Sequence, residues 1–293
     1  MAATTSFSSP MMTPTGQVQH PASLDTADSR DSGARWYYSD EELDKTPSRE
    51  DGISAETEMR YRLEGVALIK EIGQHQQRPM SQQAIATGIV FFHRFFMCQS
   101  FKDFEASKMA CTCLLLAGKV EESHRKCYDI LDRAHVFRQT QQLAEQIKQS
   151  GGVVSAEQGV KRLGRDSREY YQAKEEMLVN ERILLQAIAF ELAVEHPYPF
   201  VMKFCKKLKR QGAFAQLVWN YVNDSLRTTL CLRYKPVLIA VAAMHLAAVT
   251  QRAELPNGSN GEPWWKLLDA DLSPSLELIQ YIASVINDLY EKP

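Results

Sequence analysis

The stretch MACTCLLLAGKVEE, residues 109–122, decides how the rest of the chain is interpreted. Its first ten residues are apolar or small on every face of a helix, which is typical of a helix at the centre of a bundle. The stretch nevertheless ends on Lys119, Glu121 and Glu122. A charge at the edge of a core is costly unless a nearby group compensates it. The sequence therefore predicts a central helix whose last turn carries a cation with a purpose.

Helical patterns follow one another from residue 55 to the C-terminus, and no alternating strand pattern interrupts them. Breakers such as Pro79, Pro197, Gly212 and Pro236 separate them. We expect an all-α chain made of two successive sets of five helices. The expected ranges are roughly 55–73, 81–98, 105–121, 125–138 and 170–192, then 197–210, 213–230, 235–250, 263–270 and 274–291.

The segments outside these helices set the boundaries. Residues 1–34 are rich in Ser, Thr, Pro, Ala and Asp, which predicts a disordered segment because little apolar surface offsets the ordering entropy. Ser39, followed by two glutamates, predicts a short N-capped helix that ends near Pro47. Residues 139–169 are polar and contain glycine, which indicates an insertion loop with room for one short helix. The expected units are therefore 1–34, 35–195 with its insertion, and 196–293.

The two halves resemble each other at their third helices. ASKMACTCLLLAGKV (106–120) is similar to KPVLIAVAAMHLAAV (235–249), and both are apolar on all faces. Aligning them places Lys119 opposite Val249, so only the first copy carries the charge. This difference favours a functional role for Lys119 over a purely architectural one.

The helix expected at 170–192 holds a second charge on an apolar stripe. Glu181 lies four residues after Met177 and four before Leu185. Since the third and fifth helices of one bundle can be neighbours, we expect Lys119 and Glu181 to satisfy each other. One interpretation is a buried salt bridge, or two snorkelling side chains, with only a structural role. The other is a charged pair within an apolar patch that recognises the backbone of a partner protein.

Composition excludes several classes of function. A formal net charge of −2 argues against sequence-independent binding of nucleic acid, which usually needs a basic face. The six cysteines show no CxxC spacing, so we expect buried free thiols and no metal site. HExxH, Walker A and GxGxxG patterns are absent, and we expect no catalytic residues and no cofactor. No apolar run reaches the ~18 residues that a membrane helix needs, which predicts a soluble intracellular protein.

Several motifs, taken in order, resemble those of the cyclins. LAGKVEE (116–122) is followed by LVNERILLQAIAFEL (178–192). Further similar stretches are RWYYSDEELDKTPSREDGIS (35–54), GIVFFHRFFM (88–97), EHPYPF (195–200), VNDSLRTTLCL (222–232) and PWW (263–265). On these residues the chain is identified as a member of the transcriptional cyclins of the K and T types, and EHPY and VNDS lean towards the K type. The resemblance implies tandem cyclin boxes, two five-helix bundles preceded by a short N-terminal helix.

The resemblance also implies a function. Such a chain is expected to be a non-catalytic, nuclear regulatory subunit that activates a cyclin-dependent kinase of the transcriptional class. The complex would phosphorylate the C-terminal repeats of RNA polymerase II and promote elongation, and a third subunit is left open. Lys119 and Glu181 match the family's pair that holds the kinase segment leading into its C-helix. Leu115 matches an apolar position that packs on that helix, and Glu122 lies beside it.

The chain departs from the cyclin pattern at two places. YRLEGVAL (61–68) puts Glu64 and Gly65 where cell-cycle cyclins have the apolar residues that capture Arg-x-Leu segments, so we expect no such docking. Arg62 matches the arginine of the first helix, but its usual aspartate partner is His93 here, which puts that ion pair in doubt.

Two other classes of function compete with this interpretation. A DNA-associated factor of the TFIIB type shares the doubled five-helix fold, but it predicts a basic surface and an N-terminal zinc ribbon. An all-helical enzyme is the third possibility, and it would show turnover without any added kinase.

Overall fold

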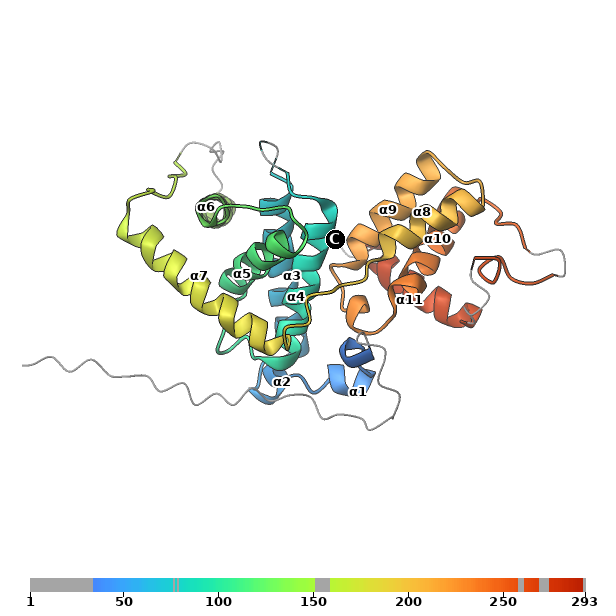
Figure 1. Ribbon diagram of the computed structural model, residues 1–293, viewed down its shortest axis with the longest axis horizontal. Coiled ribbons are helices and arrows are strands. Elements are labelled where there is room, and N and C mark those ends of the chain that lie inside the picture. The colour runs from blue at the N-terminus through green and yellow to red at the C-terminus, as the bar shows by residue number, and fades with distance from the viewer. Residues whose placement is uncertain are drawn as a thin grey trace, which may run out of the picture.

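The computed structural model describes residues 34–75, 77, 79–150, 159–257, 261–268 and 274–291, and their regular structure is all helical (Figure 1). We expected disorder for residues 1–34, and all of these except Ala34 lie outside the described residues. Four short helices are η1 (Ala34–Trp36), α1 (Asp40–Leu43), α2 (Pro47–Glu50) and η2 (Leu230–Leu232). The long helices of the first half are α3 (Ala55–Gly73), α4 (Gln82–Cys98), α5 (Ala106–Val120), α6 (Cys127–Ser150) and α7 (Arg168–Ala187). Those of the second half are α8 (Pro197–Lys207), α9 (Ala213–Ser225), α10 (Pro236–Gln251) and α11 (Leu276–Glu291).

Helices α5 and α10 lie at the centres of the two halves, as their all-apolar faces predict. Helix α5 packs against α3, α4, α6 and α7, and α10 packs against α8, α9 and α11. Helix α4 lies against α5 at Gly88, where an added Cβ would make an ordinary contact 3.4 Å from the Cα of Leu114. The aromatic run of α4 fills the first core, and the stacked rings of Phe96 and Phe101 have centroids 3.6 Å apart. Tandem helical bundles around apolar centres are therefore the architecture of the chain.

Several expected helix bounds were wrong. The helix expected at 170–192 ends at Ala187, and the helix expected at 213–230 ends at Ser225. Helix α6 continues to Ser150 instead of ending at 138, so part of the expected insertion at 139–169 is helix. Its added residues are mostly Gln, Ala, Glu, Leu and Lys, which are good helix formers, and their polarity suits an exposed helix. The helix expected at 263–270 is not present in Trp264–Leu268, which form turns closed by bonds between residues three apart, such as Lys266 N to Pro263 O. Trp264 and Trp265 are buried, so packing of their side chains holds this segment in place although it does not form a regular helix.

The segment before α3 joins the two halves. Ser39 forms a capping box with Glu42 at the start of α1, as expected, but Pro47 begins α2 rather than ending a helix. Trp36 is 1% exposed and donates from Nε1 to Glu191, with a distance of 2.6 Å. Tyr38 N donates to the carbonyl of Leu232, 2.8 Å away, in the second half.

Polar contacts lock the halves directly together. His93 Nε2 lies 3.0 Å from the carbonyl of Leu226, and Lys70 Nζ donates to the carbonyl of Asn223 over 3.1 Å. Gln82 donates to both Tyr198 and Asn223. These contacts involve partners more than 100 residues apart, so they hold α3 and α4 against the start of α8 and the end of α9. No helix within the described part of the chain is long and apolar enough to cross a membrane.

Candidate functional site

Lys119 and Glu181 meet, as the two apolar stripes predict. Lys119 Nζ, in the last turn of α5, lies 2.6 Å from Oε1 and 2.8 Å from Oε2 of Glu181 on α7. The apolar stripe of α7 places Glu181 there, because Met177 and Leu184 are buried against the first core. A lysine ammonium has three donors, so the pair retains hydrogen-bonding capacity on both sides.

Exposure separates the two interpretations of this pair. The Lys119 side chain is 48% exposed, whereas that of Glu181 is 12% exposed. The pair is therefore not a fully buried salt bridge: the carboxylate is set into the surface and the ammonium covers it from the solvent side. Such a pair contributes about 0–1 kcal/mol to folding, too little to explain its presence by stability alone.

A chain of hydrogen bonds fixes the end of α5 that carries the lysine. The Thr87 hydroxyl on α4 donates to Glu121 Oε1 over 2.7 Å, and His196 Nε2 lies 2.7 Å from the hydroxyl oxygen of Thr87. Because the hydroxyl proton is already used, His196 must donate from Nε2. Burial, and then the nearby Arg94, lowers the pKa of His196 to about 4, which keeps the ring neutral at physiological pH. The start of the second half thus anchors the last turn of α5.

The two weaker site residues lie close to Lys119 but differ in exposure. Leu115, one turn earlier on α5, is 4% exposed, so the chain's own helices cover it and it supports the end of α5 from within. Glu122 is exposed and has a φ of 52°, in the left-handed region just after the helix ends. Glycine usually occupies this position, since other residues pay a conformational cost there.

A second ion pair between the same helices was not predicted. Lys108 Nζ lies 2.7 Å from Glu176 Oε1, and their side chains are 43% and 44% exposed. Lys108 and Lys119 are eleven residues apart, about three helical turns, so both lie on the face of α5 next to α7. This spacing is the sequence signal that could have revealed the second pair.

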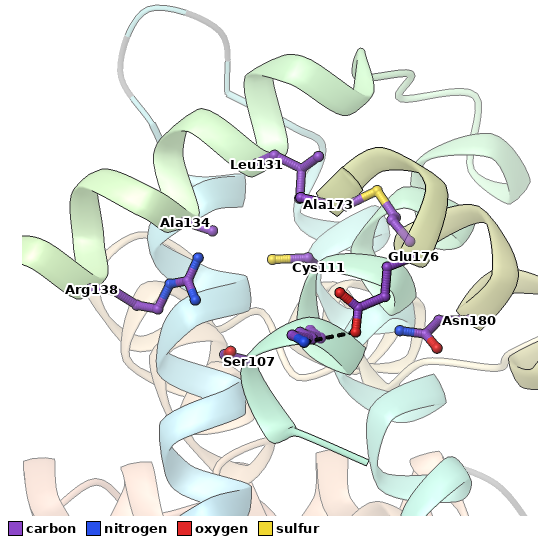
Figure 2. A pocket seen from close by; sticks show the side chains of 10 residues that line it. Ser107, Cys111, Leu131, Ala134, Arg138, Ala173, Glu176 and Asn180 are labelled. Carbon is purple, nitrogen blue, oxygen red and sulfur yellow. Dashed lines mark hydrogen bonds and ion pairs between the residues drawn. The ribbon is translucent and has the colours of Figure 1, made fainter. Parts of the chain in front are cut away.

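A pocket opens beside the second pair, between α5, α6 and α7 (Figure 2). Figure 2 shows Cys111 on α5 beneath Leu131 and Ala134 of α6, with Glu176 of α7 on the other side of the pocket. Lys108, which donates to Glu176, also lines the pocket. Burial raises the pKa of the Cys111 thiol to about 12, so it is not a reactive thiolate. The expected buried free thiols are found at Cys98, Cys111, Cys113 and Cys205, whereas Cys127 and Cys231 are half-buried.

The internal arginine keeps a carboxylate partner, although not the expected one. Arg62 donates from Nη2 to Glu58 Oε1, 2.8 Å away, one turn earlier on α3. Its Nη1 lies 3.4 Å from Nδ1 of His93 and 3.2 Å from that residue's carbonyl. Burial, and then the Arg62 charge, lowers the pKa of His93 to about 3, so the ring is neutral. Arg62 thus pairs with a carboxylate on its own helix, and the His93 ring contacts the second half.

Among the residues that the structure describes, no three His, Cys, Asp or Glu side chains gather in a way that could hold a metal ion. The geometry at Lys119 and Glu181 suits recognition of amides and carbonyls rather than chemistry on a substrate.

Comparisons with known proteins agree with this architecture. The family model of the cyclin N-terminal domain matches residues 34–193, and that of the Cyclin-T2-like C-terminal domain matches 196–288. Cyclin-K of Homo sapiens is 37% identical over 264 residues, which cover 88% of this chain and 41% of the human protein. Cyclin-K of Danio rerio is also 37% identical, covering 88% of this chain and 56% of that protein. Cyclin-T2 of Homo sapiens is 32% identical, covering 91% of this chain and 34% of that protein.

Solved structures show the same fold at lower identity. A chain of the yeast RNA Pol II CTD kinase CTDK-1 complex superposes with a TM-score of 0.61 at 16% identity, covering 87% of this chain and 73% of that one. A chain of the yeast TFIIK complex superposes with a TM-score of 0.52 at 18% identity, covering 86% of this chain and 96% of that one. The chain spans 41% and 56% of the two cyclin-K proteins. The model of the cyclin N-terminal domain matches more than half of this chain. The chain therefore belongs to the cyclin family, whose members are regulatory subunits of kinases and not enzymes.

Proposed function

We propose that this cyclin binds and activates a cyclin-dependent kinase of the transcriptional class in the nucleus. The observation that carries the proposal is the half-exposed Lys119 held over Glu181 at the end of the central helix. The proposal takes residues 35–195 and 196–293 as the two cyclin boxes. The relatives of the K and T types support the transcriptional class, since they match along most of this chain.

The surface around the pair suits a protein partner. Helix α7 exposes Leu178 by 40% and Val179 by 39%, and Phe190, just after it, is 66% exposed. Exposed apolar side chains on and just after the helix that carries Glu181 are typical of a surface that a partner covers. The ammonium can donate to the partner's carbonyls while the carboxylate accepts from its amides, so the pair recognises a main chain of fixed geometry.

Activation would follow from differential binding. If the cyclin surface contacts the kinase C-helix only in its inward position, binding shifts the kinase towards the state in which that helix orients ATP through its glutamate. The cyclin supplies no reacting group in this mechanism. Phosphorylation of RNA polymerase II C-terminal repeats is the proposed output, and a third subunit remains compatible with it.

Affinity capture from nuclear extract tests the proposal. The wild-type chain is compared with Glu181→Ala, and Glu176→Ala is the matched control because it removes the other ion pair between α5 and α7. We expect quantitative mass spectrometry to find a kinase with the wild type and the control, and at least tenfold less with Glu181→Ala. The captured kinase should phosphorylate a heptad-repeat substrate. Equal capture by all three chains, or by none, would contradict the proposed role of the pair.

A further inference from the structure

A basic pocket lies away from the two ion pairs, between the end of α3, the start of α6 and the segment that precedes α7. It encloses about 890 Å³, including the solvent at its mouth. Two aspartates and five cations line it, so cations are in excess. The cations are Arg125, Lys126, Arg133, Arg162 and Arg165.

The wall of the pocket is held in place by hydrogen bonds. Asp132 on α6, whose side chain is 6% exposed, accepts from Arg162 Nη1 over 2.8 Å and from the backbone N–H of Leu163 over 2.9 Å. The Tyr128 hydroxyl donates to the carbonyl of Leu163, 2.7 Å away. The guanidinium of Arg165 lies 4.3 Å above the centre of the Tyr128 ring. Both arginines of this segment are therefore positioned before any ligand arrives.

The pocket offers donors that the protein itself does not use. Arg133 pairs with Glu71 through Nη2, but its Nε is enclosed and has no hydrogen-bond partner among the residues that the structure describes. At the start of α6, the N–H groups of Asp129 and Ile130 donate to the carbonyl of Lys126, whereas those of Cys127 and Tyr128 have no acceptor within the helix. Burial and then the charges of nearby arginines lower the pKa of His75 on the rim, as a positive local potential requires.

We propose that this pocket binds the phosphate of a phosphorylated serine or threonine in a peptide. Guanidinium groups match a phosphate dianion with paired hydrogen bonds, and several from different segments enclose it. Ile72 and Val136 add an apolar wall for a neighbouring side chain of the peptide. A nucleic acid fits less well, because the two aspartates would repel its successive phosphates and the chain as a whole carries a net charge of −2.

Fluorescence anisotropy with labelled peptides tests this proposal. The probes are a degenerate peptide library with a central phosphoserine or phosphothreonine, the same library unphosphorylated, and a single-stranded RNA. The test variant is Arg162→Gln/Arg165→Gln. The control is Arg60→Gln/Lys102→Gln, which removes two exposed cations outside the pocket. We expect the phosphorylated library to bind at least tenfold more tightly than the unphosphorylated one, and only the pocket variant to lose that difference.

Three results would overturn the proposal. They are equal binding of both libraries, an unchanged affinity of the pocket variant, and tighter binding of the RNA than of the phosphopeptides. Competition with inorganic phosphate distinguishes the source of the anion. If calorimetry shows that inorganic phosphate binds, but phosphorylation of the peptide does not raise its affinity, the pocket binds the free ion and the peptide assignment is wrong. Circular dichroism of both variants shows that a loss of binding is not a loss of fold.

Discussion

Replacing Arg62 by methionine removes a cation from the interior of the first half. The arginine side chain is 2% exposed and its partner Glu58 is 5% exposed. Arg62 Nη2 also donates to the carbonyl of Phe96, 3.1 Å away, in the last turn of α4, where carbonyls lack partners within the helix. The substitution keeps most of the apolar volume and removes only the charge and the donors.

The magnitude follows from what the substitution leaves behind. Breaking a buried ion pair by removing one partner costs about 3–5 kcal/mol, because the remaining charge is uncompensated. Here Glu58 retains Arg49 Nε at 2.8 Å and the hydroxyl of Thr46 at 2.8 Å, so the lower end of that range applies. We expect a loss of about 3 kcal/mol in the free energy of unfolding. The shift in melting temperature is about 2–4 °C per kcal/mol for 150–250 residues and smaller for a chain of 293, so the melting temperature should fall by no more than about 12 °C.

Urea denaturation followed by circular dichroism measures this loss, with Arg60→Met as the matched control. Arg60 lies on the same helix, but its side chain is 63% exposed and its contact with Glu64 is 3.8 Å long, so we expect its replacement to cost less than about 0.5 kcal/mol. If Arg62→Met lost less than about 1 kcal/mol, or no more than the control, the reasoning from burial would be refuted.

Three further predictions concern stability. Lys119→Ala and Lys108→Ala should each lower the free energy of unfolding by at most about 1 kcal/mol, because both lysines are half exposed. If only the Lys119 variant unfolded, the Lys119–Glu181 pair would have a structural role. The pKa of His93 falls from 6.5 to about 3 on folding, so between these pH values the unfolded chain binds a proton that the native chain does not. The free energy of unfolding should therefore fall as the pH drops from 6.5 towards 3, by up to about 1.4 kcal/mol per pH unit. Urea titrations at pH 7 and pH 5 should show a smaller loss for His93→Asn than for the wild type. Gly65→Ala places a Cβ 2.1 Å from a buried phenylalanine ring and should cost about 1–3 kcal/mol, whereas Gly88→Ala, with its nearest atom at 3.4 Å, should be neutral or stabilising in a thermal melt.

The sequence by itself determined the helical class, the doubled arrangement and the central helices, because these depend on local periodicity and on which faces are apolar. It also predicted that Lys119 and Glu181 meet, since each is a charge on an apolar stripe and needs a partner. The helix propensity of residues 139–150 favours the observed end of α6 at Ser150, whereas their polarity favours a loop.

Only the tertiary structure decided how exposed these charges are and which groups compensate them. The exposure of Lys119 depends on how far α7 covers the end of α5. Glu58 was a possible partner of Arg62 by its spacing, but its burial and its second contact with Arg49 depend on how α2 packs. The basic pocket unites residues from 72 to 165, which nothing in local sequence brings together. Local patterns fix helices through contacts a few residues apart, whereas burial and charge compensation depend on long-range packing that a single sequence does not specify.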